Sequence, residues 1–189
     1  MDRTKMRERL YDKLDKKRYE HSIGVSYTAS AMAMAFGEDP EKALIAGLLH
    51  DCAKNIPSDE KVEKCKKHKI PVNSFEKKNP ELLHAKLSAY YAKKKYEVDD
   101  EDILSAITWH TTGRANMTTL EKIIYIADYI EPNRKPLPEM DEIRREAFTD
   151  LDKCLVHILK NTIRYLEKKD KDSIDPVTKD TYNYYCKRK

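Results

Sequence analysis

The sequence predicts an all-α fold, a helical bundle that forms one domain over residues 1–189. Only four of the 189 residues are glycine, where average usage would give about 13, so tight hairpins have few places to form. Apolar side chains recur at helical spacing, and several segments open with capping residues. No stretch of useful length alternates as a strand does, although KIIYIADYI is rich in β-branched residues.

Two helices are expected in the N-terminal part of the chain. The first covers residues 2–19 and carries an apolar side chain at every fourth position: Met6, Leu10 and Leu14. The second covers about 19–36 and ends at Gly37, because glycine readily adopts the left-handed conformation that terminates a helix.

A third helix, residues 40–54, is apolar on nearly all sides. Asp39 can cap its first turn, and Pro40 suits the first helical position. Ala46 and Gly47 would let a neighbouring helix approach closely. We therefore expect this helix to be the central, buried one. It ends in the stretch LLHDCAK, which carries a His-Asp pair.

The remaining helices follow from the same start and stop signals. They are a short charged helix at 59–69, a helix capped by Asn79, a helix from about Asp100, a helix opened by a Thr118–Glu121 capping box, a long amphipathic helix at about 140–168, and a short last helix after a turn in the tail. The core is expected over about 19–135, with the helices of about 140–185 packed on it.

The composition narrows the class of protein. Charged residues make up 37% of the chain and the net charge is +4, a mildly basic balance that does not demand nucleic acid. No apolar run approaches the roughly 20 residues of a membrane span. The N-terminal residues are charged throughout, unlike a secretory signal. We expect a cytoplasmic protein with no membrane partner and no specific nucleic-acid partner.

The four cysteines show no paired spacing. They are Cys52, Cys65, Cys154 and Cys186. In a cytosolic chain, cysteines without a CxxC or similar pattern are expected to be reduced thiols, and a structural zinc site is not expected.

His50 and Asp51 stand at the end of the helix that is expected to be buried. Ionised groups there cost several kcal/mol unless they are paired or bound to a metal. Considered alone, the pair has a local explanation: Asp51 bonds a nearby amide or basic group, and His50 is a satisfied core histidine.

The other helices favour a shared site. Each carries an imidazole or carboxylate on its apolar face: His21, His84, His110 and Asp128. Several such groups directed toward one core indicate a divalent cation that satisfies them together. Nitrogen and oxygen donors without thiolates suit six-coordinate iron or manganese with open positions better than a closed zinc site. Hydrolysis of a phosphate ester or anhydride is the chemistry that such a site favours.

The order of these residues resembles a known family. A histidine on one helix, an adjacent His-Asp pair on the next and a distant aspartate are the signature of HD-domain metal-dependent phosphohydrolases. Five sequence segments are similar to those of the bacterial YqeK-type HD hydrolases: RYEHSIGV, AGLLHDCAK, WHTTGR, KIIYIADYIEPNRK and IDPVT. The resemblance extends from about Met6 to Tyr185. One departure is Asp175, where that family usually has a histidine, so a substrate contact in the tail is not implied.

The resemblance implies an activity and roles for named residues. The activity is symmetrical hydrolysis of diadenosine tetraphosphate to two ADP by a homodimer. The implied metal ligands are His21, His50, Asp51 and Asp128. The implied phosphate contacts are Lys54, His84, His110, Thr111 and Arg134, of which Lys54, His84 and His110 are assigned catalytic roles. Iron is the implied metal, with manganese or magnesium as alternatives.

Residue chemistry supports part of this assignment. Lys54 would share a helical face with His50 and Asp51, and the Arg134 guanidinium can clamp a phosphate. Arg114 is more simply a solvated surface charge. A second metal at His84 and His110 and the identity of the histidine that protonates the leaving ADP stay open. Two other functions also stay open: a phosphohydrolase of mononucleotides, and a non-catalytic nucleotide-binding helical module.

Overall fold

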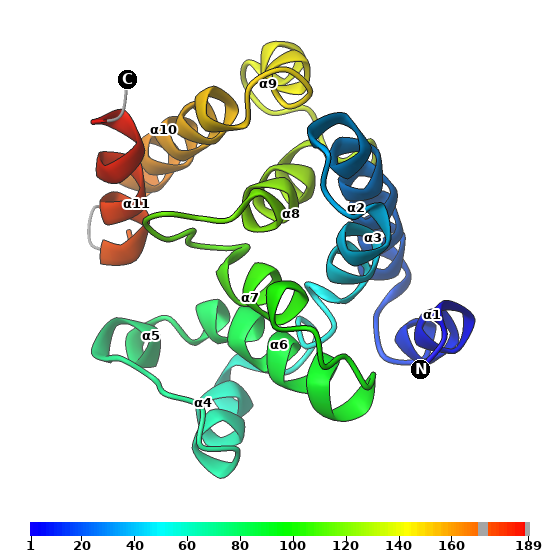
Figure 1. Cartoon of the computed structure of the whole chain (residues 1–189). Coiled ribbons are helices and arrows are strands. Elements are labelled where there is room, and N and C mark those ends of the chain that lie inside the picture. Colours follow the sequence, from blue (N-terminus) through cyan, green and yellow to red (C-terminus); the bar gives the residue numbers. More distant parts are fainter. Residues whose placement is uncertain (170–173, 188–189) are drawn as a thin grey trace.

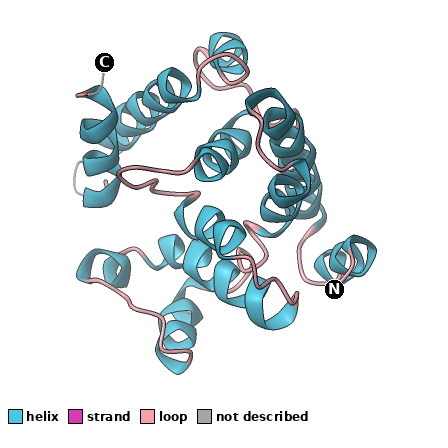
Figure 2. Cartoon of the chain, viewed as in Figure 1, coloured by secondary structure: helices cyan, strands magenta, loops and turns pink. Residues whose placement is uncertain are grey.

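The computed structural model describes residues 1–169 and 174–187, and this part of the chain consists of helices and loops, without a β-strand (Figures 1 and 2). The helices are α1 (Arg3–Tyr11), α2 (Lys16–Phe36), α3 (Pro40–Leu49), α4 (Ser58–Lys67), α5 (Ser74–Lys78), the 3-10 helix η1 (Pro80–Leu82), α6 (Leu83–Lys95), α7 (Glu101–Trp109), α8 (Thr119–Ile130), α9 (Met140–Glu146), α10 (Leu151–Lys169) and α11 (Pro176–Cys186). The all-α prediction is confirmed. The turn predicted before the last helix falls partly on 170–173, outside the described residues.

The centre of the molecule is built from α2, α3, α7 and α8 (Figure 1). α8 contacts α2 and α3 on one side and α10 on another, while α6 and α7 pack together beside it. α3 approaches α2 closely: a Cβ at Gly47 would lie 2.8 Å from the Cα of Ser26. The absent side chain of Gly47 thus lets the two backbones meet, as the sequence predicts.

Two hydrophobic clusters hold these helices together. The larger cluster includes fully buried side chains from most of the chain, among them Leu10, Leu49, Ile124 and Leu155. A smaller cluster lies between α4 and α6 and contains Cys65, Leu83 and Leu87. The four cysteines are free thiols. In the described residues, none of the helices combines the length and the apolar character needed to cross a membrane.

Helix capping explains where the predicted first helix is wrong. The expected helix over 2–19 ends at Tyr11, and α2 begins at Lys16. The side chain of Asp15 accepts a hydrogen bond from the amide of Arg18 at 2.9 Å. This cap starts a new helix in a new direction, although the buried Leu14 keeps the apolar period across the break.

The long helix predicted over 140–168 is also wrong. α9 ends at Glu146 and α10 begins at Leu151. Between them, the side chain of Asp150 accepts from the amide of Lys153 at 2.9 Å, which caps α10. The apolar pattern continues on both sides of the turn, so the period alone does not reveal it.

The region around Asn79 differs from its prediction too. A capping box formed by Asn73 and Glu76 starts the short helix α5, which the sequence reading missed. The side-chain amide of Asn79 donates to the carbonyl of Phe75 at the end of α5 at 3.1 Å, and the Asn79 side chain makes no capping hydrogen bond to η1. The Thr118–Glu121 capping box, the helix start near Asp100 and the left-handed stop at Gly37 are confirmed.

Candidate metal centre

Six predicted side chains from five helices meet at the centre of the bundle. They are His21 on α2, His50 and Asp51 after α3, His84 on α6, His110 after α7, and Asp128 on α8. All are buried except Asp128, whose side chain is 21% exposed. Residues separated by more than 100 positions thus converge at one place.

Three of the imidazoles are oriented in the same way. The Nδ1 atoms of His50, His84 and His110 lie 2.7, 2.5 and 2.7 Å from the carbonyl oxygens of the residues three positions earlier. A carbonyl only accepts, so each Nδ1 carries the proton and donates it. Each Nε2 is therefore left with a lone pair that faces the other imidazoles. Metal-binding histidines show this arrangement.

His21 follows the same rule with a carboxylate in place of a carbonyl. Its Nδ1 lies 3.0 Å from Oε1 of Glu131, and its Nε2 lies 2.9 Å from Oδ1 of Asp128. Glu131 is 1% exposed, and its second oxygen accepts from the amide of Asn133 at 2.7 Å. Glu131 thus fixes the ring of His21 from outside the cluster, as outer carboxylates do in metal sites.

Asp51 lies between two sets of donors. Its Oδ2 is 3.5 Å from Nε2 of His50 and 4.0 Å from Nε2 of His21. Its Oδ1 is 3.2 Å from Nε2 of His84 and 3.6 Å from Nε2 of His110. The first set is His21 and His50, with Asp128 as a further donor, and the second set is His84 and His110. Asp51 belongs to both sets. One carboxylate therefore faces two potential cation positions.

Three atoms of the cluster test whether a metal fits. Nε2 of His50 and Oδ1 of Asp51 are buried and have no hydrogen-bond partner, and Nε2 of His21 forms no well-aligned hydrogen bond although Oδ1 of Asp128 lies 2.9 Å away. Buried polar atoms are normally satisfied, and leaving them unsatisfied costs about 1–3 kcal/mol each. Imidazole nitrogens and carboxylate oxygens are suitable ligands for divalent iron or manganese. The residues present therefore fit a divalent metal.

The charge states of His50, His84 and Asp51 agree with this fit, whereas the pKa of His21 is raised because Asp128 and Glu131 outweigh the effect of burial. Burial lowers the pKa of His50 to about 3 and also lowers the pKa of His84, despite the opposing charge of Asp51. Burial alone would raise the pKa of Asp51, but His50, His110 and His84 hold the pKa of this carboxyl well below its usual range. Neutral imidazoles and an ionised carboxylate are the forms that bind metals.

Basic side chains line the entrance to the cluster. A cavity of about 370 Å³ opens between the start of α2 and the loop after α8. Its lining includes His21 and Glu131 together with four cations: Lys17, Arg18, Arg134 and Lys135. We call this cavity the cationic mouth. Its charge and position suit a polyanion that reaches the buried donors.

Two arginines connect the mouth to the cluster. Nη1 of Arg18 lies 2.6 Å from Oδ2 of Asp51, and Nη2 of Arg134 lies 2.9 Å from Oδ1 of Asp128. Sequence reasoning named Arg134 and missed Arg18 and Glu131. A signal existed for both, because each lies three residues from a predicted ligand and thus on the same helical face: Arg18 before His21 and Glu131 after Asp128.

Lys54 lies in the site, but on a turn and not on the helix that the sequence predicts. The helix expected to extend to residue 54 ends at Leu49, and turns follow. The amide of Ala53 donates to Oγ of Ser88 at 3.1 Å, which supports a turn in place of a further helical turn. Nζ of Lys54 lies 3.2 Å from Nε2 of His84, and burial lowers the pKa of the Lys54 ammonium.

The HTTGR segment brings Thr111 as well as His110 to the cluster and keeps Arg114 away from it. Oγ1 of Thr111 lies 3.3 Å from Nε2 of His84, so the predicted phosphate contact Thr111 lies in the site. Arg114 instead pairs with the fully buried Glu121, with Nη2 2.9 Å from Oε1. Arg114 thus holds the start of α8, a structural role. Asp175 caps α11 by accepting from the amide of Val177.

Comparisons with known proteins agree with this geometry. Residues 18–133 match the model of the HD domain family. The chain is 46% identical over 172 residues to the symmetrical bis(5'-nucleosyl)-tetraphosphatase of Bacillus subtilis strain 168, covering 91% of this chain and 89% of that protein. It is 42% identical over 183 residues to the protein of the same name from Halalkalibacterium halodurans, covering 97% and 96%.

A solved structure is also similar over its whole length. The crystal structure of a Clostridium acetobutylicum protein, described as a predicted HD superfamily hydrolase involved in NAD metabolism, superposes with a TM-score of 0.96 at 43% sequence identity. The match covers 100% of this chain and 99% of that one.

Proposed function

The chain belongs to the HD domain family, and from that premise we propose that it is a metal-dependent phosphohydrolase that splits diadenosine tetraphosphate symmetrically into two ADP. The observation that carries the proposal is a set of buried, unpartnered donor atoms at the end of a cationic mouth. The similarity to two symmetrical tetraphosphatases over most of their length supports the choice of substrate.

We place one divalent cation at His21, His50, Asp51 and Asp128, and a second at Asp51, His84 and His110. The two faces of the Asp51 carboxylate support the second position, which the sequence left open. Cations bound there supply a water molecule of lowered pKa and polarise phosphoryl oxygens. Iron is the metal we propose, with manganese and magnesium as alternatives, because the donors are nitrogen and oxygen.

The cationic mouth binds and orients the tetraphosphate. Arg18 and Arg134 each have one N–H on a carboxylate of the cluster, and a guanidinium has further donors for phosphate oxygens. Lys17 and Lys135 add charge at the outer edge. Holding the phosphate chain at several points selects which phosphorus faces the cluster, and the symmetrical cleavage requires that selection.

Lys54 supplies the proton for the leaving ADP in this proposal. The Nδ1 protons of His84 and His110 are held by backbone carbonyls, and their Nε2 atoms face the cluster. Neither histidine is therefore free to act as an acid, and we assign both to metal binding in place of the predicted catalytic role. The Lys54 ammonium lies beside them, and its lowered pKa suits proton transfer.

Product analysis tests the proposed function. The purified chain is incubated with diadenosine tetraphosphate and with iron, manganese or magnesium in turn, and the nucleotides are separated. The expected product is ADP alone. Formation of ATP plus AMP, or no turnover of this substrate while a nucleoside monophosphate is cleaved, would overturn the proposal in favour of a different phosphohydrolase. Turnover of neither substrate would favour a non-catalytic nucleotide-binding module.

Three further features belong to the proposal. The larger hydrophobic cluster has members from Met6 to Tyr185, which supports a single domain. The homodimer stays a prediction from the resemblance, and the cytoplasmic location stays a prediction from the sequence.

A further inference from the structure

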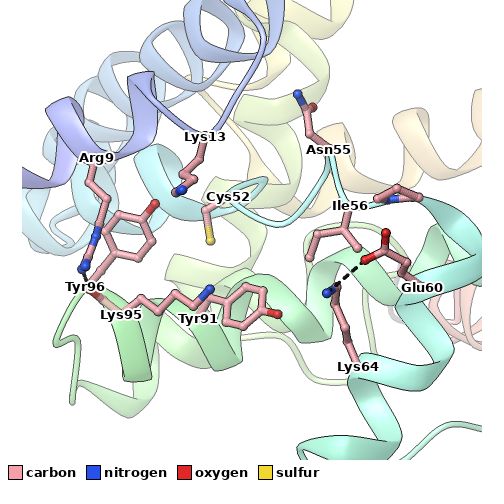
Figure 3. Close-up of a pocket in the computed structure, with 11 residues that line it drawn as sticks. Arg9, Lys13, Cys52, Asn55, Ile56, Glu60, Lys64, Tyr91, Lys95 and Tyr96 are labelled. Carbon is pink, nitrogen blue, oxygen red and sulfur yellow. Dashed lines mark hydrogen bonds and ion pairs between the residues drawn. The ribbon is translucent and has the colours of Figure 1, made fainter.

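A second pocket lies on the reverse side of the turn that carries Asp51 and Lys54. It has a volume of about 300 Å³. Four cations stand at its rim, Arg9, Lys13, Lys64 and Lys95, and two tyrosines form its floor, Tyr91 and Tyr96 (Figure 3). We call it the reverse pocket. It shares no lining residue with the cationic mouth.

The turn between α3 and α4 faces both sites. Asp51 and Lys54 point to the metal centre, whereas Cys52, Asn55 and Ile56 line the reverse pocket. Figure 3 shows the sulfur of Cys52 directed into the space between Lys13 and Tyr91. The remaining walls come from α1, the link after α1, α4 and α6.

The rim carries positive charge that the protein does not neutralise. Its single acid, Glu60, pairs with Lys64 at 3.0 Å. Across the described residues, no carboxylate lies within ion-pair distance of Arg9, Lys13 or Lys95; the guanidinium of Arg9 donates to the carbonyl of Lys95 instead.

Tyrosine rings hold two of these cations in place. Nζ of Lys95 lies 3.9 Å from the ring centroid of Tyr91, and the guanidinium carbon of Arg9 lies 5.8 Å from that of Tyr96. Both rings are nearly fully buried. A ring face attracts a cation but carries no net charge. The cations are therefore positioned while their charge stays available to an anion.

We propose that the reverse pocket binds the phosphate chain of a nucleotide, at a site separate from the metal centre. Three unpaired cations favour a multiply charged anion over a monoanion, and the volume accommodates a diphosphate group. The choice of a nucleotide rests on the proposed function, because ADP is released on the other side of the same turn. The nucleotide is either the far half of the bound substrate or a free molecule.

Kinetics distinguish these two sources. The double variant Lys13→Gln/Lys95→Gln removes two rim cations and leaves the metal centre intact. If the far half of the substrate occupies the pocket, this variant raises KM for diadenosine tetraphosphate about tenfold and leaves kcat unchanged. If a free nucleotide occupies it, KM is unchanged, and added ADP alters the rate of the wild type in a way that the variant has lost.

Direct titration with ADP tests the site without relying on turnover. Calorimetry is carried out on the wild type, the double variant and a matched control, Lys16→Gln/Lys94→Gln, which removes two exposed lysines outside both pockets. In the wild type and the control, one ADP per chain is expected to bind at the reverse pocket. In the double variant only, the affinity of this site for ADP is expected to fall about tenfold or more. Identical isotherms for the three proteins would overturn the reverse site, whatever the product analysis shows.

Discussion

Within residues 1–169 and 174–187, histidine and carboxylate groups gather in two regions. One is the central cluster around Asp51. The other lies on α9 and α10, where donor atoms of Glu142, Glu146 and His157 come within 4.8 Å of one another. By residue type alone, both regions resemble a metal site.

The partners of the donor atoms separate the two regions. In the peripheral group, Nδ1 of His157 lies 2.9 Å from Glu146, and Nε2 lies 2.6 Å from Glu139. The other oxygen of Glu146 pairs with Lys153 at 3.0 Å. In the central cluster, each Nδ1 is likewise bonded, yet Nε2 of His50 and Oδ1 of Asp51 are buried without a hydrogen-bond partner. A metal site is therefore marked by buried donors left unpaired rather than by composition.

The largest expected effect comes from Asp51→Asn. The substitution removes the charge that both cation positions share, so turnover of diadenosine tetraphosphate should fall at least about 10³-fold. Replacing a residue that only holds a ligand in place typically costs about 10–100-fold. The matched change in the peripheral group, Glu146→Gln, should leave turnover unchanged. Equal losses in both variants would show that the two clusters do not differ as described.

Lys54→Gln should have the next largest effect. Removing a proton donor typically costs about 10²-fold or more in kcat, whereas the metal content should stay that of the wild type because Lys54 is not a ligand. Lys66→Gln, a change at an exposed lysine paired with Glu63, serves as the control. Steady-state kinetics and elemental analysis on the same preparations check both parts. Loss of metal from the Lys54 variant would assign Lys54 a structural role.

Glu131→Gln tests the outer support of the cluster. It replaces the carboxylate that holds Nδ1 of His21 by an amide, and metal affinity should fall about 10–100-fold. Competition with a chelator measures the affinity. Glu139→Gln, which alters the corresponding carboxylate on His157, should leave the affinity unchanged. An unaltered affinity in Glu131→Gln would separate His21 from metal binding.

The smallest effect concerns the stability of the peripheral group. Burial lowers the pKa of His157, but its hydrogen bonds to Glu139 and Glu146 outweigh burial and raise the pKa above its ordinary value. A raised pKa stabilises the folded protein below the unfolded value of about 6.5, and this contribution is lost as the pH rises through the folded value. His157→Gln should thus reduce the free energy of unfolding by up to about 1 kcal/mol at about pH 5.5 and by less at about pH 9. Denaturant unfolding at both pH values measures it, and an equal reduction at both would contradict the raised pKa.

The convergence of the central cluster was predictable from sequence because each member is a polar residue on, or at the end of, an apolar helical face. His21 and Asp128 stand out in this way without any knowledge of the fold. Arg18 and Glu131 share a helical face with His21 and Asp128, but that spacing alone does not decide their role, because a charge near a helix end looks the same whether it contacts solvent or a buried ligand. Their roles follow only when the packing of α2 against α8 is known.

The helix boundaries show a similar limit. Breaks at Asp15 and Asp150 depend on single side-chain caps inside a continuous apolar period. The turn that carries Lys54 depends on Ser88, which lies 35 residues beyond Ala53 and captures its amide. Local patterns contain no information on such a long-range bond. The reverse pocket is hidden for the same reason, since its walls come from segments that lie far apart in the sequence.

Metal content per chain tests the contrast between the two clusters most directly. The wild type, His50→Ala and His157→Ala are purified side by side, their helical content is verified by circular dichroism, and bound iron, manganese and magnesium are measured by elemental analysis. His157→Ala is expected to keep the metal content of the wild type, and His50→Ala is expected to lose most of it while it stays folded. A folded His50→Ala protein with the full metal content would contradict the assignment of the central cluster as the metal centre.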